Sequence, residues 1–253
     1  MSLLQIDGLR KSFGGVAALD DLSFTLPAGQ MLALIGPNGA GKSTCFNVIN
    51  GQLRPDAGRV LLDGADIAGL DPRRIWARGV GRTFQVSAAF ASLTVLENVQ
   101  AALLSHHRRL WQLWRPAAAC LRQEAMQLLE QVGMADQAGR ACGVLAYGDI
   151  KRLELAMALS NAPRLLLMDE PTAGMAPRER QELMALTRRL VSERGLSVLF
   201  TEHSMDVVFA FADRIIVLAR GQLIAQGEPE AVRQDARVRD VYFGSGASFG
   251  SAA

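Results

Sequence analysis

The stretch GPNGAGKST, residues 36–44, constrains the fold of this chain more than any other part of the sequence. It fits the pattern G-x-x-x-x-G-K-[ST], follows the apolar run MLALI and precedes a helix-like segment, which is the context that the pattern requires. Its glycines let successive backbone N–H groups point at one anion, while Lys42 can reach outer phosphates and the Ser43 hydroxyl can coordinate Mg²⁺. The predicted phosphate-binding residues are Gly36, Pro37, Asn38, Gly39, Ala40, Gly41, Lys42, Ser43 and Thr44.

A pair of acidic residues provides the carboxylates that the phosphate-binding loop does not contain. In RLLLMDE, Asp169 follows an apolar run and Glu170 comes directly after it. Asp169 is a candidate for the Mg²⁺ shell, and Glu170 is a candidate to orient or deprotonate an attacking water. Alone, such a pair is usually only a solvated strand end. Together with the loop at residues 36–44, it is better interpreted as part of one phosphate and Mg²⁺ site.

The order of the short strands predicts an α/β fold with two kinds of sheet. Up to about residue 62 the chain reads as LLQI, LSFTL and RVLLDG with turn residues between them, which predicts an N-terminal antiparallel β subdomain. Later, LLLMDE, SVLFTE and RIIVLA alternate with helical or loop segments, as in a parallel layer. The apolar run MLALI fits a strand covered on both faces. We therefore expect a P-loop NTPase core with a mixed or parallel sheet.

Residues from about 87 to 161 contain no convincing strand and predict a helical subdomain inserted in the α/β core. Thr94 and Glu97 form a capping box ahead of VLENVQAALL. One helical face of LRQEAMQLLEQVGM carries Leu121, Ala125, Leu128, Leu129 and Val132. A further helix is predicted from Pro177 to the stop at Gly195. We expect one domain over residues 1–243 and a flexible tail over residues 244–253, because the tail is small and polar.

The bulk composition limits the classes of function. The 253 residues are 49% hydrophobic, enough for one large domain or two small ones with buried cores. With 27 basic and 25 acidic residues the net charge is only +2, so the chain lacks the basic field that a nucleic-acid partner usually requires.

The sequence also indicates a reducing compartment. Cys45, Cys120 and Cys142 form no CxxC pair and are predicted to be small buried residues rather than disulfide partners or metal ligands. The N-terminal residues show no secretory-signal pattern, and the apolar runs are far shorter than the roughly 20 residues that span a bilayer. Any membrane role is therefore expected to come through a partner.

Five motifs in a fixed order carry a family resemblance over nearly the whole chain. They are GPNGAGKST, RTFQ with Gln85, LAYGD at residues 145–149, LLLMDEPT, and TEHS with His203. In this order they resemble the nucleotide-binding subunit of ATP-binding cassette transporters. The resemblance implies that the chain binds ATP with Mg²⁺ and hydrolyses it.

The resemblance also implies roles for single residues. Phe13 stands at the aromatic position that stacks on adenine, Gln85 at the position that senses Mg²⁺ and the membrane partner, and His203 at the γ-phosphate switch. The catalytic candidates are then Glu170, His203 and Gln85, and the metal candidates are Ser43, Gln85 and Asp169. Phe13 and His203 each have a simpler alternative, because Phe13 could belong to the core and a lone histidine is more often structural than catalytic.

LAYGD stands where the family has its signature loop, which binds the γ-phosphate of ATP held by the opposite subunit. Leu145 and Gly148 keep the family pattern, whereas Ala146, Tyr147 and Asp149 replace serine, glycine and glutamine. The missing serine hydroxyl removes one charge-assisted hydrogen bond, worth roughly 1.5 to 3 kcal/mol in other settings.

The helix after this loop is expected to contribute to phosphate binding. It is predicted to begin near Ile150, where Asp149 would cap it, and this would explain an acid at that place. Its N-terminal dipole and backbone N–H groups attract an anion without any side chain. We therefore predict that LAYGD still holds ATP, less tightly than the usual signature.

Further segments resemble the branched-chain amino acid branch of the cassette importers. They are RTFQ, LTVLENV at residues 93–99, the YG of the signature LAYGD, TAGMAP at residues 172–177 and VRDVYFG at residues 238–244. In TAGMAP, Ala176 lacks the carboxylate that usually crosses to the other subunit, so this contact is expected to be missing. Members of the branch carry leucine-type amino acids, urea, short amides or aromatic acids, and their cassettes do not touch the cargo.

The same resemblance implies a set of partners. The chain is expected to pair with a second cassette, alike or different, and to bind integral membrane permease subunits. A periplasmic or extracellular solute-binding protein acts indirectly, and no nucleic acid is expected. The implied location is the cytoplasmic face of the bacterial inner membrane, where the chain is a peripheral subunit.

Two other classes of function fit part of the sequence. A soluble cassette protein acting on DNA or ribosomes usually has paired cassettes or a long coiled coil, and this chain has one cassette and no heptad run. A P-loop kinase for a small molecule would leave LAYGD and His203 without a role. The basic segment at residues 105–123, with Trp111 and Trp114, suits a membrane subunit or a lipid surface, but a solvated helical face is the more common explanation.

Overall fold

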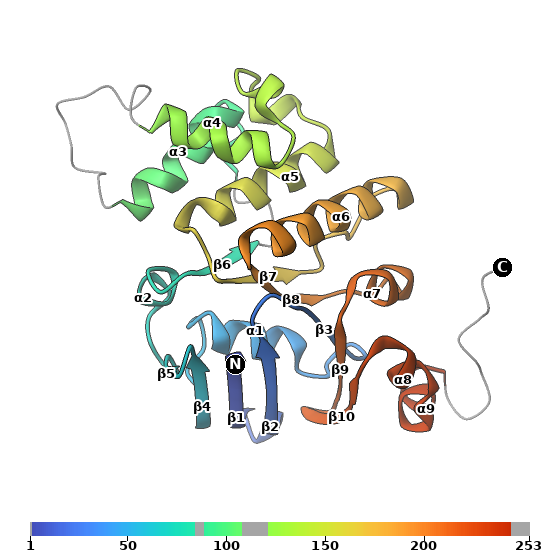
Figure 1. Ribbon diagram of the computed structural model, residues 1–253. Helices are drawn as coiled ribbons and strands as arrows, with labels where there is room; N and C mark the ends of the chain where they lie inside the picture. Colours follow the sequence, from blue (N-terminus) through green and yellow to red (C-terminus); the bar gives the residue numbers. More distant parts are fainter. Residues whose placement is uncertain (1, 84–88, 108–120, 244–253) are drawn as a thin grey trace.

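The computed structural model describes residues 2–83, 89–107 and 121–243, which form two β-sheets with helices around them (Figure 1). The first sheet has the strand order β2-β1-β4-β5. Its strands are β1 (Ser2–Phe13), β2 (Val16–Pro27), β4 (Ala57–Leu62) and β5 (Ala65–Asp66). β1 lies between β2 and β4 and is antiparallel to both. The predicted N-terminal antiparallel subdomain is therefore confirmed.

The second sheet forms the centre of the molecule, with the strand order β10-β9-β3-β8-β7-β6. Its strands are β3 (Met31–Ile35), β6 (Val80–Thr83), β7 (Leu165–Asp169), β8 (Ser197–Thr201), β9 (Arg214–Ala219) and β10 (Gln222–Gly227). The strands from β9 to β6 are parallel to their neighbours, and β10 is antiparallel to β9. This arrangement confirms the mixed sheet and the parallel layer expected from the sequence.

β3 lies inside this sheet and shows why the run MLALI is apolar throughout. Met31, Ala33 and Ile35 belong to one hydrophobic core, and Leu32 and Leu34 belong to the other. The second core also contains buried residues of the antiparallel sheet, of α1 (Lys42–Ile49) and of α2 (Pro72–Trp76). The first core contains buried residues of α6 (Pro177–Arg194) and of α7 (Met205–Phe211). The central strands are thus covered on both faces.

Between β6 and β7 the described residues form helices, with one isolated β-bridge between Thr94 and Ala141. The elements are α3 (Val95–His106), α4 (Arg122–Gln131), η2 (Ala135–Gln137), η3 (Cys142–Val144), α5 (Tyr147–Ala158) and η4 (Leu159–Asn161). The predicted capping box is present, since Thr94 N–H donates to Glu97 Oε2 at 2.8 Å and Glu97 N–H donates to Thr94 Oγ1 at 3.2 Å. These helices are the inserted helical subdomain at the top of Figure 1.

The start of α5 differs from the prediction. The helix begins at Tyr147 rather than near Ile150, because extended Ala146 already accepts the Ile150 N–H at 3.0 Å. Asp149 therefore lies in the first turn and does not cap the helix. Its Oδ2 instead accepts a hydrogen bond from Gln137 Nε2 at 3.2 Å. A first turn that faces water can form without a side-chain cap.

The C-terminal part of the chain completes the first core. α6 ends before Gly195, whose φ of 65° stops the helix as expected. After β10 the chain forms α8 (Pro229–Gln234) and α9 (Ala236–Phe243), and Val232 and Val238 are buried in the same core. None of the helices in the described ranges is both long enough and apolar enough to cross a membrane.

Two of the three cysteines can be placed. Cys45 and Cys142 are buried and free, as predicted, and burial raises the pKa of the Cys45 thiol to about 12. Cys120, Gln85, Trp111, Trp114 and the predicted tail at residues 244–253 lie outside the described residues.

Candidate functional site

Residues 36–44 join the C-terminal end of β3 to α1, as the sequence predicts. Gly36 has a φ of 154°, and a Cβ atom there would lie 2.3 Å from the Leu218 carbonyl oxygen of β9. Gly41 precedes α1 with a φ of 104°, and a Cβ atom there would lie 2.4 Å from the Ala18 carbonyl oxygen of β2. Glycine is therefore required at both places, where the loop passes close to neighbouring strands.

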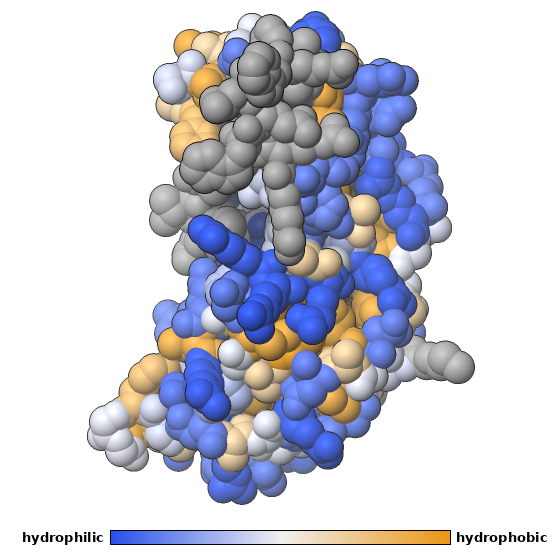
Figure 2. Space-filling model, turned by 90° about the vertical axis from the view of Figure 1, so that its left-hand side faces the viewer, coloured by the Kyte–Doolittle hydropathy of each residue, from blue (hydrophilic) through white to orange (hydrophobic). Residues whose placement is uncertain are grey.

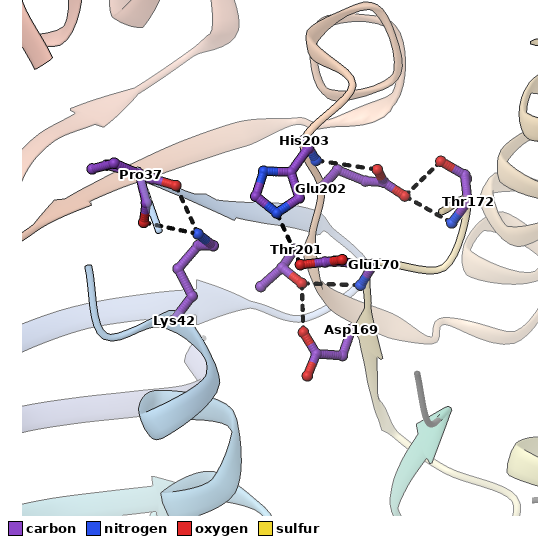
Figure 3. A network of polar contacts seen from close by, with 9 residues as sticks. Pro37, Lys42, Asp169, Glu170, Thr172, Thr201, Glu202 and His203 are labelled. Atoms are coloured by element: carbon purple, nitrogen blue, oxygen red, sulfur yellow. Dashed lines mark hydrogen bonds and ion pairs between the residues drawn. The ribbon is translucent and has the colours of Figure 1, made fainter. Parts of the chain in front are cut away.

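Lys42 is the first residue of α1, and its side chain reaches back over this loop (Figure 3). Its Nζ donates to the carbonyl oxygens of Gly36 at 2.7 Å and Pro37 at 3.1 Å. Burial lowers the pKa of Lys42, while the charges of Glu170 and Asp169 act in the opposite direction. An ammonium group held by two neutral carbonyls can exchange them for the oxygens of a phosphate, because a charged acceptor forms the stronger hydrogen bond.

Several other predicted residues of the loop face solvent. Pro37, Asn38, Gly39 and Ser43 are exposed, Gly41 and Thr44 are half-buried, and Ala40 is buried. Ser43 lies in the first turn of α1, so its hydroxyl is accessible to a metal ion at the helix N-terminus.

Phe13 lies at the end of β1 and is 48% exposed, so it is not a core residue. It pairs with Val16 of β2, and Ala18 of the same strand contacts Gly41. The hairpin that carries Phe13 is therefore next to the phosphate-binding loop. An exposed aromatic ring near that loop can stack on a base.

The predicted acidic pair lies where β7 ends beside β8 (Figure 3). Thr201 Oγ1 donates to Asp169 Oδ1 at 2.8 Å and accepts the Glu170 N–H at 3.0 Å. Glu170 Oε1 lies 2.9 Å from His203 Nε2. The sheet thus brings Asp169, Glu170 and His203 together at its C-terminal edge, where open α/β sheets bind their ligands.

Besides Thr201, two further residues outside the predicted site join this network. Glu202 Oε1 accepts hydrogen bonds from Thr172 N–H at 2.8 Å and Thr172 Oγ1 at 2.7 Å. Glu202 Oε2 accepts the His203 N–H at 3.3 Å. The buried Glu202 carboxylate therefore ties the segment after Asp169 and Glu170 to the segment that carries His203. The sequence signal was an acidic residue at the end of the apolar run in SVLFTE.

LAYGD forms the N-terminal end of α5 and contacts the segment before α6. Leu145 and Gly148 are buried, whereas Ala146 and Tyr147 are exposed. A Cβ atom on Gly148 would lie 3.2 Å from Glu179 Oε1 of α6, and one on Gly174 would lie 3.5 Å from the Tyr147 ring. The loop and residues 173–176 are therefore in contact within one chain.

Ala176 is the residue before α6 and has no side-chain oxygen. Its N–H donates to Glu179 Oε2 at 3.1 Å, which satisfies one of the free N–H groups at the start of α6. The Glu179 carboxylate therefore lies beside this position and accepts a hydrogen bond from its own chain.

The fold and the site define a P-loop nucleoside triphosphatase of the cassette type. The chain belongs to the ABC transporter family, because residues 19–173 match that family. It therefore carries an ATPase domain that binds and hydrolyses ATP. Residues 222–248 match a second family, described as "Branched-chain amino acid ATP-binding cassette transporter".

Curated relatives match nearly the whole chain. The high-affinity branched-chain amino acid transport ATP-binding protein BraF of Pseudomonas aeruginosa is 38% identical over 96% of this chain and 98% of its own. The corresponding protein LivG of Escherichia coli is 36% identical with the same coverage.

Solved structures agree with these relatives. A nucleotide-free cassette from an ABC transporter is 32% identical with a TM-score of 0.86, covering 96% of this chain and 100% of that one. The ADP conformation of the cassette MJ1267 is 33% identical with a TM-score of 0.86, covering 96% and 99%. The cassette MJ0796, described as dimeric and bound to ADP and Pi, is 26% identical with a TM-score of 0.75, covering 89% and 98%.

Proposed function

We propose that this chain is the ATP-hydrolysing subunit of an importer that carries branched-chain amino acids, or related small polar or amide solutes, through separate permease subunits. The observation that carries the proposal is the match of residues 222–248 to the branched-chain family. This segment begins with β10 and includes α8 and α9. It is distant in sequence from the phosphate-binding loop at residues 36–44. The full-length similarity to BraF and LivG supports the same branch.

In this proposal the residues of the site divide the work of hydrolysis. Lys42 and the backbone N–H groups of residues 36–44 hold the phosphates, and Phe13 stacks on the adenine. Glu170 orients a water molecule and takes its proton as the water attacks the γ-phosphorus. The bond from phosphorus to the ADP oxygen breaks as the new bond to water forms. His203, 2.9 Å from Glu170, positions that carboxylate and contacts the γ-phosphate.

The residues present fit a Mg²⁺ ion beside the phosphates. Ser43 is exposed at the start of α1, and the Asp169 carboxylate is oriented by the Thr201 hydroxyl. Oxygen ligands of these types suit Mg²⁺, which when bound supplies positive charge against the phosphates. Gln85 is proposed as a further ligand from the sequence.

A second cassette is proposed to complete the site. In the proposed pair, the LAYGD loop of one cassette binds the γ-phosphate held by the other, and the dimeric relative bound to ADP and Pi supports such a pair. Since Ala146 has no hydroxyl, the donors are the backbone N–H groups at the start of α5. ATP then favours the closed pair, because it binds that state more tightly than the open one.

A hydrophobic surface supports a permease partner. Phe90 and Val144 are 58% and 66% exposed, and the Gly143 N–H donates to the Ala91 carbonyl at 3.1 Å, so the two side chains lie in neighbouring segments. One face of the molecule also carries hydrophobic side chains with hydrophilic ones around them (Figure 2). Exposed apolar surface with a polar rim is typical of a protein interface.

The partners and the extent of the domain complete this proposal. The permease places the chain at the cytoplasmic face of the inner membrane, and a solute-binding protein delivers the cargo from outside. Residues 1–243 act as one ATPase domain, with the helical subdomain at about residues 87–161 inserted in the core.

The proposal is tested by uptake in a strain of the source organism that lacks this reading frame. Uptake of labelled leucine, isoleucine, valine, urea, a short amide and an aromatic acid is measured after returning the wild-type chain or Glu170→Gln. We expect the deletion strain to lose uptake of one of these solutes. The wild-type chain should restore that uptake, and Glu170→Gln should not. Unchanged uptake of all six solutes in the deletion strain would contradict the proposal.

A further inference from the structure

Arg82 lies where β6, α1 and the end of β7 come together. It belongs to β6, the edge strand beside β7, and residues 84–88 with Gln85 follow that strand directly. Its side chain is only 9% exposed. A buried guanidinium group needs several acceptors, so its contacts are expected to hold the surrounding elements in place.

The guanidinium contacts both α1 and the end of β7. Nη1 donates to Asn47 Oδ1 at 2.9 Å and to Gln52 Oε1 at 3.2 Å, and the group lies 5.9 Å from the centroid of the Phe46 ring. Nη2 donates to Asp169 Oδ2 at 3.3 Å. One cation therefore connects β6 to the helix that follows the phosphate-binding loop and to the carboxylate proposed for Mg²⁺.

Asp169 is the acceptor at which two cations would compete. The Asp169 side chain is 12% exposed, and each of its oxygens has a protein donor, Thr201 for Oδ1 and Arg82 for Oδ2. Charges buried to this degree interact more strongly than charges in water. The contact of 3.3 Å is longer than the usual 2.7–2.9 Å of a charge-assisted hydrogen bond, so it is one of the weaker contacts of Arg82.

We propose that Arg82 competes with Mg²⁺ for Asp169, so that binding of Mg²⁺·ATP weakens the contact that ties β6 to Asp169. Without the metal, Arg82 neutralises the Asp169 carboxylate and ties β6 to it. A divalent cation near that carboxylate repels the guanidinium, weakens the contact and loosens β6 just before Gln85. By reciprocity, the Arg82 contact lowers the affinity of the site for Mg²⁺ by the same factor. Arg82 is thus a positioning residue, and this inference rests on the proposed Mg²⁺·ATP site.

The proposal is tested by binding of a fluorescent ATP analogue in EDTA and in Mg²⁺. The measured quantity is the ratio of the Kd in EDTA to the Kd in Mg²⁺. Taking this ratio cancels any effect of Arg82 on binding of the analogue without metal. We expect Arg82→Gln to raise this ratio by about 5- to 150-fold, the usual range of coupling between two sites. Arg82→Lys keeps the charge and should stay near the wild-type ratio. A ratio that is unchanged or lower in Arg82→Gln overturns the proposal.

A matched control and a second measurement distinguish a wrong proposal for Arg82 from a variant that does not fold and from a wrong proposed function. Arg164→Gln removes a charge from the exposed ion pair with Asp63, at 2.7 Å, and should leave the ratio unchanged. In the wild-type chain, amide hydrogen exchange of residues 80–83 should be faster with ATP and Mg²⁺ than with ATP and EDTA. This measurement decides the proposal even where Arg82→Gln does not fold, and equal or slower exchange overturns it. A wild-type chain that binds no nucleotide would instead refute the proposed function.

Discussion

Glu170 is held in a backbone conformation that few residues adopt. Its φ is 49°, in the left-handed region that non-glycine residues seldom populate. Its N–H is within hydrogen-bond distance of both the Thr201 carbonyl oxygen, at 3.2 Å, and the Thr201 hydroxyl, at 3.0 Å. Residues in sparsely populated conformations persist where the surroundings impose them, and they cluster at active sites. The strain at Glu170 is therefore consistent with its proposed role in orienting water.

Gly148 is the residue of LAYGD whose substitution tests that loop most directly. We predict that Gly148→Asp abolishes ATP hydrolysis, because the new carboxylate would lie beside Glu179 and repel a γ-phosphate at the start of α5. Gly148→Ala adds the same crowding without the charge and should keep more activity. The assay is phosphate release from ATP, and activity surviving in Gly148→Asp would refute the proposed role of the loop.

Ala146→Ser tests the same loop by adding a hydrogen-bond donor for the phosphate. Ala146 is the residue before α5, so a serine there can cap the helix and stabilise it by about 1 kcal/mol. We expect hydrolysis to rise or to stay unchanged, since the hydroxyl adds one donor for a phosphate. A clear loss of phosphate release in this variant would contradict the expectation.

At the scale of residues, the motifs located most of the candidate site but not the groups that support it. Asp169, Glu170 and His203 were predicted because each stands at a fixed place in an ordered motif. Arg82 was part of a quoted motif, yet its contact with Asp169 depends on the pairing of β6 with β7, which the sequence does not state. Glu202 was missed for the same reason, because its partner Thr172 lies on another segment.

At the scale of elements, Asp213 joins β3, β9 and α6. It accepts the Met31 N–H at 2.7 Å and both terminal nitrogens of Arg188, at 2.8 and 2.7 Å. Burial alone would raise the pKa of Asp213, but the hydrogen bonds from Arg188 and Met31 hold it below the ordinary value of 3.8. The charged carboxylate therefore stabilises the folded state.

We predict that Asp213→Asn lowers the free energy of unfolding by about 1 to 2 kcal/mol at neutral pH, since the partly exposed pair is screened by water. Because the folded pKa is below the unfolded one, this contribution is fully present above pH 3.8 and is lost as pH falls through the lower folded pKa. Urea unfolding across pH measures the difference. Arg178→Gln, which breaks an exposed ion pair with Glu182 in the same helix, is the control and should change stability by less than about 0.5 kcal/mol. A difference that does not decrease at low pH would contradict the assignment.

Strands with continuous apolar runs were predicted well, and the start of a helix with weak local signals was not. MLALI, LLLMDE and SVLFTE are apolar runs bounded by turn residues, so their positions followed from sequence. The start of α5 was placed about three residues late because Tyr147 and Gly148 do not favour a helix. Both residues lie close to residues 174–179, and local sequence does not encode this proximity.

At the scale of the whole molecule, two hydrophobic cores lie on the two faces of the central sheet. Buried residues of α1 belong to one core, and those of the helical subdomain and α6 to the other. The central sheet lies between them, and its C-terminal edge carries Asp169, Glu170 and His203. The phosphate-binding loop and LAYGD are consequently on different parts of the chain (Figure 1), which suits a nucleotide held between two cassettes.

The central claim is that ATP is held between two cassettes and that Glu170 is needed for hydrolysis but not for binding. Sedimentation velocity of Glu170→Gln with ATP and Mg²⁺, followed by absorbance of both protein and nucleotide, tests it most directly. The account predicts a dimer that carries ATP and that disappears when EDTA replaces Mg²⁺. Nucleotide that sediments only as free ATP, or only with a monomer, would contradict the claim that the LAYGD loop of one copy binds phosphate held by a second, identical copy.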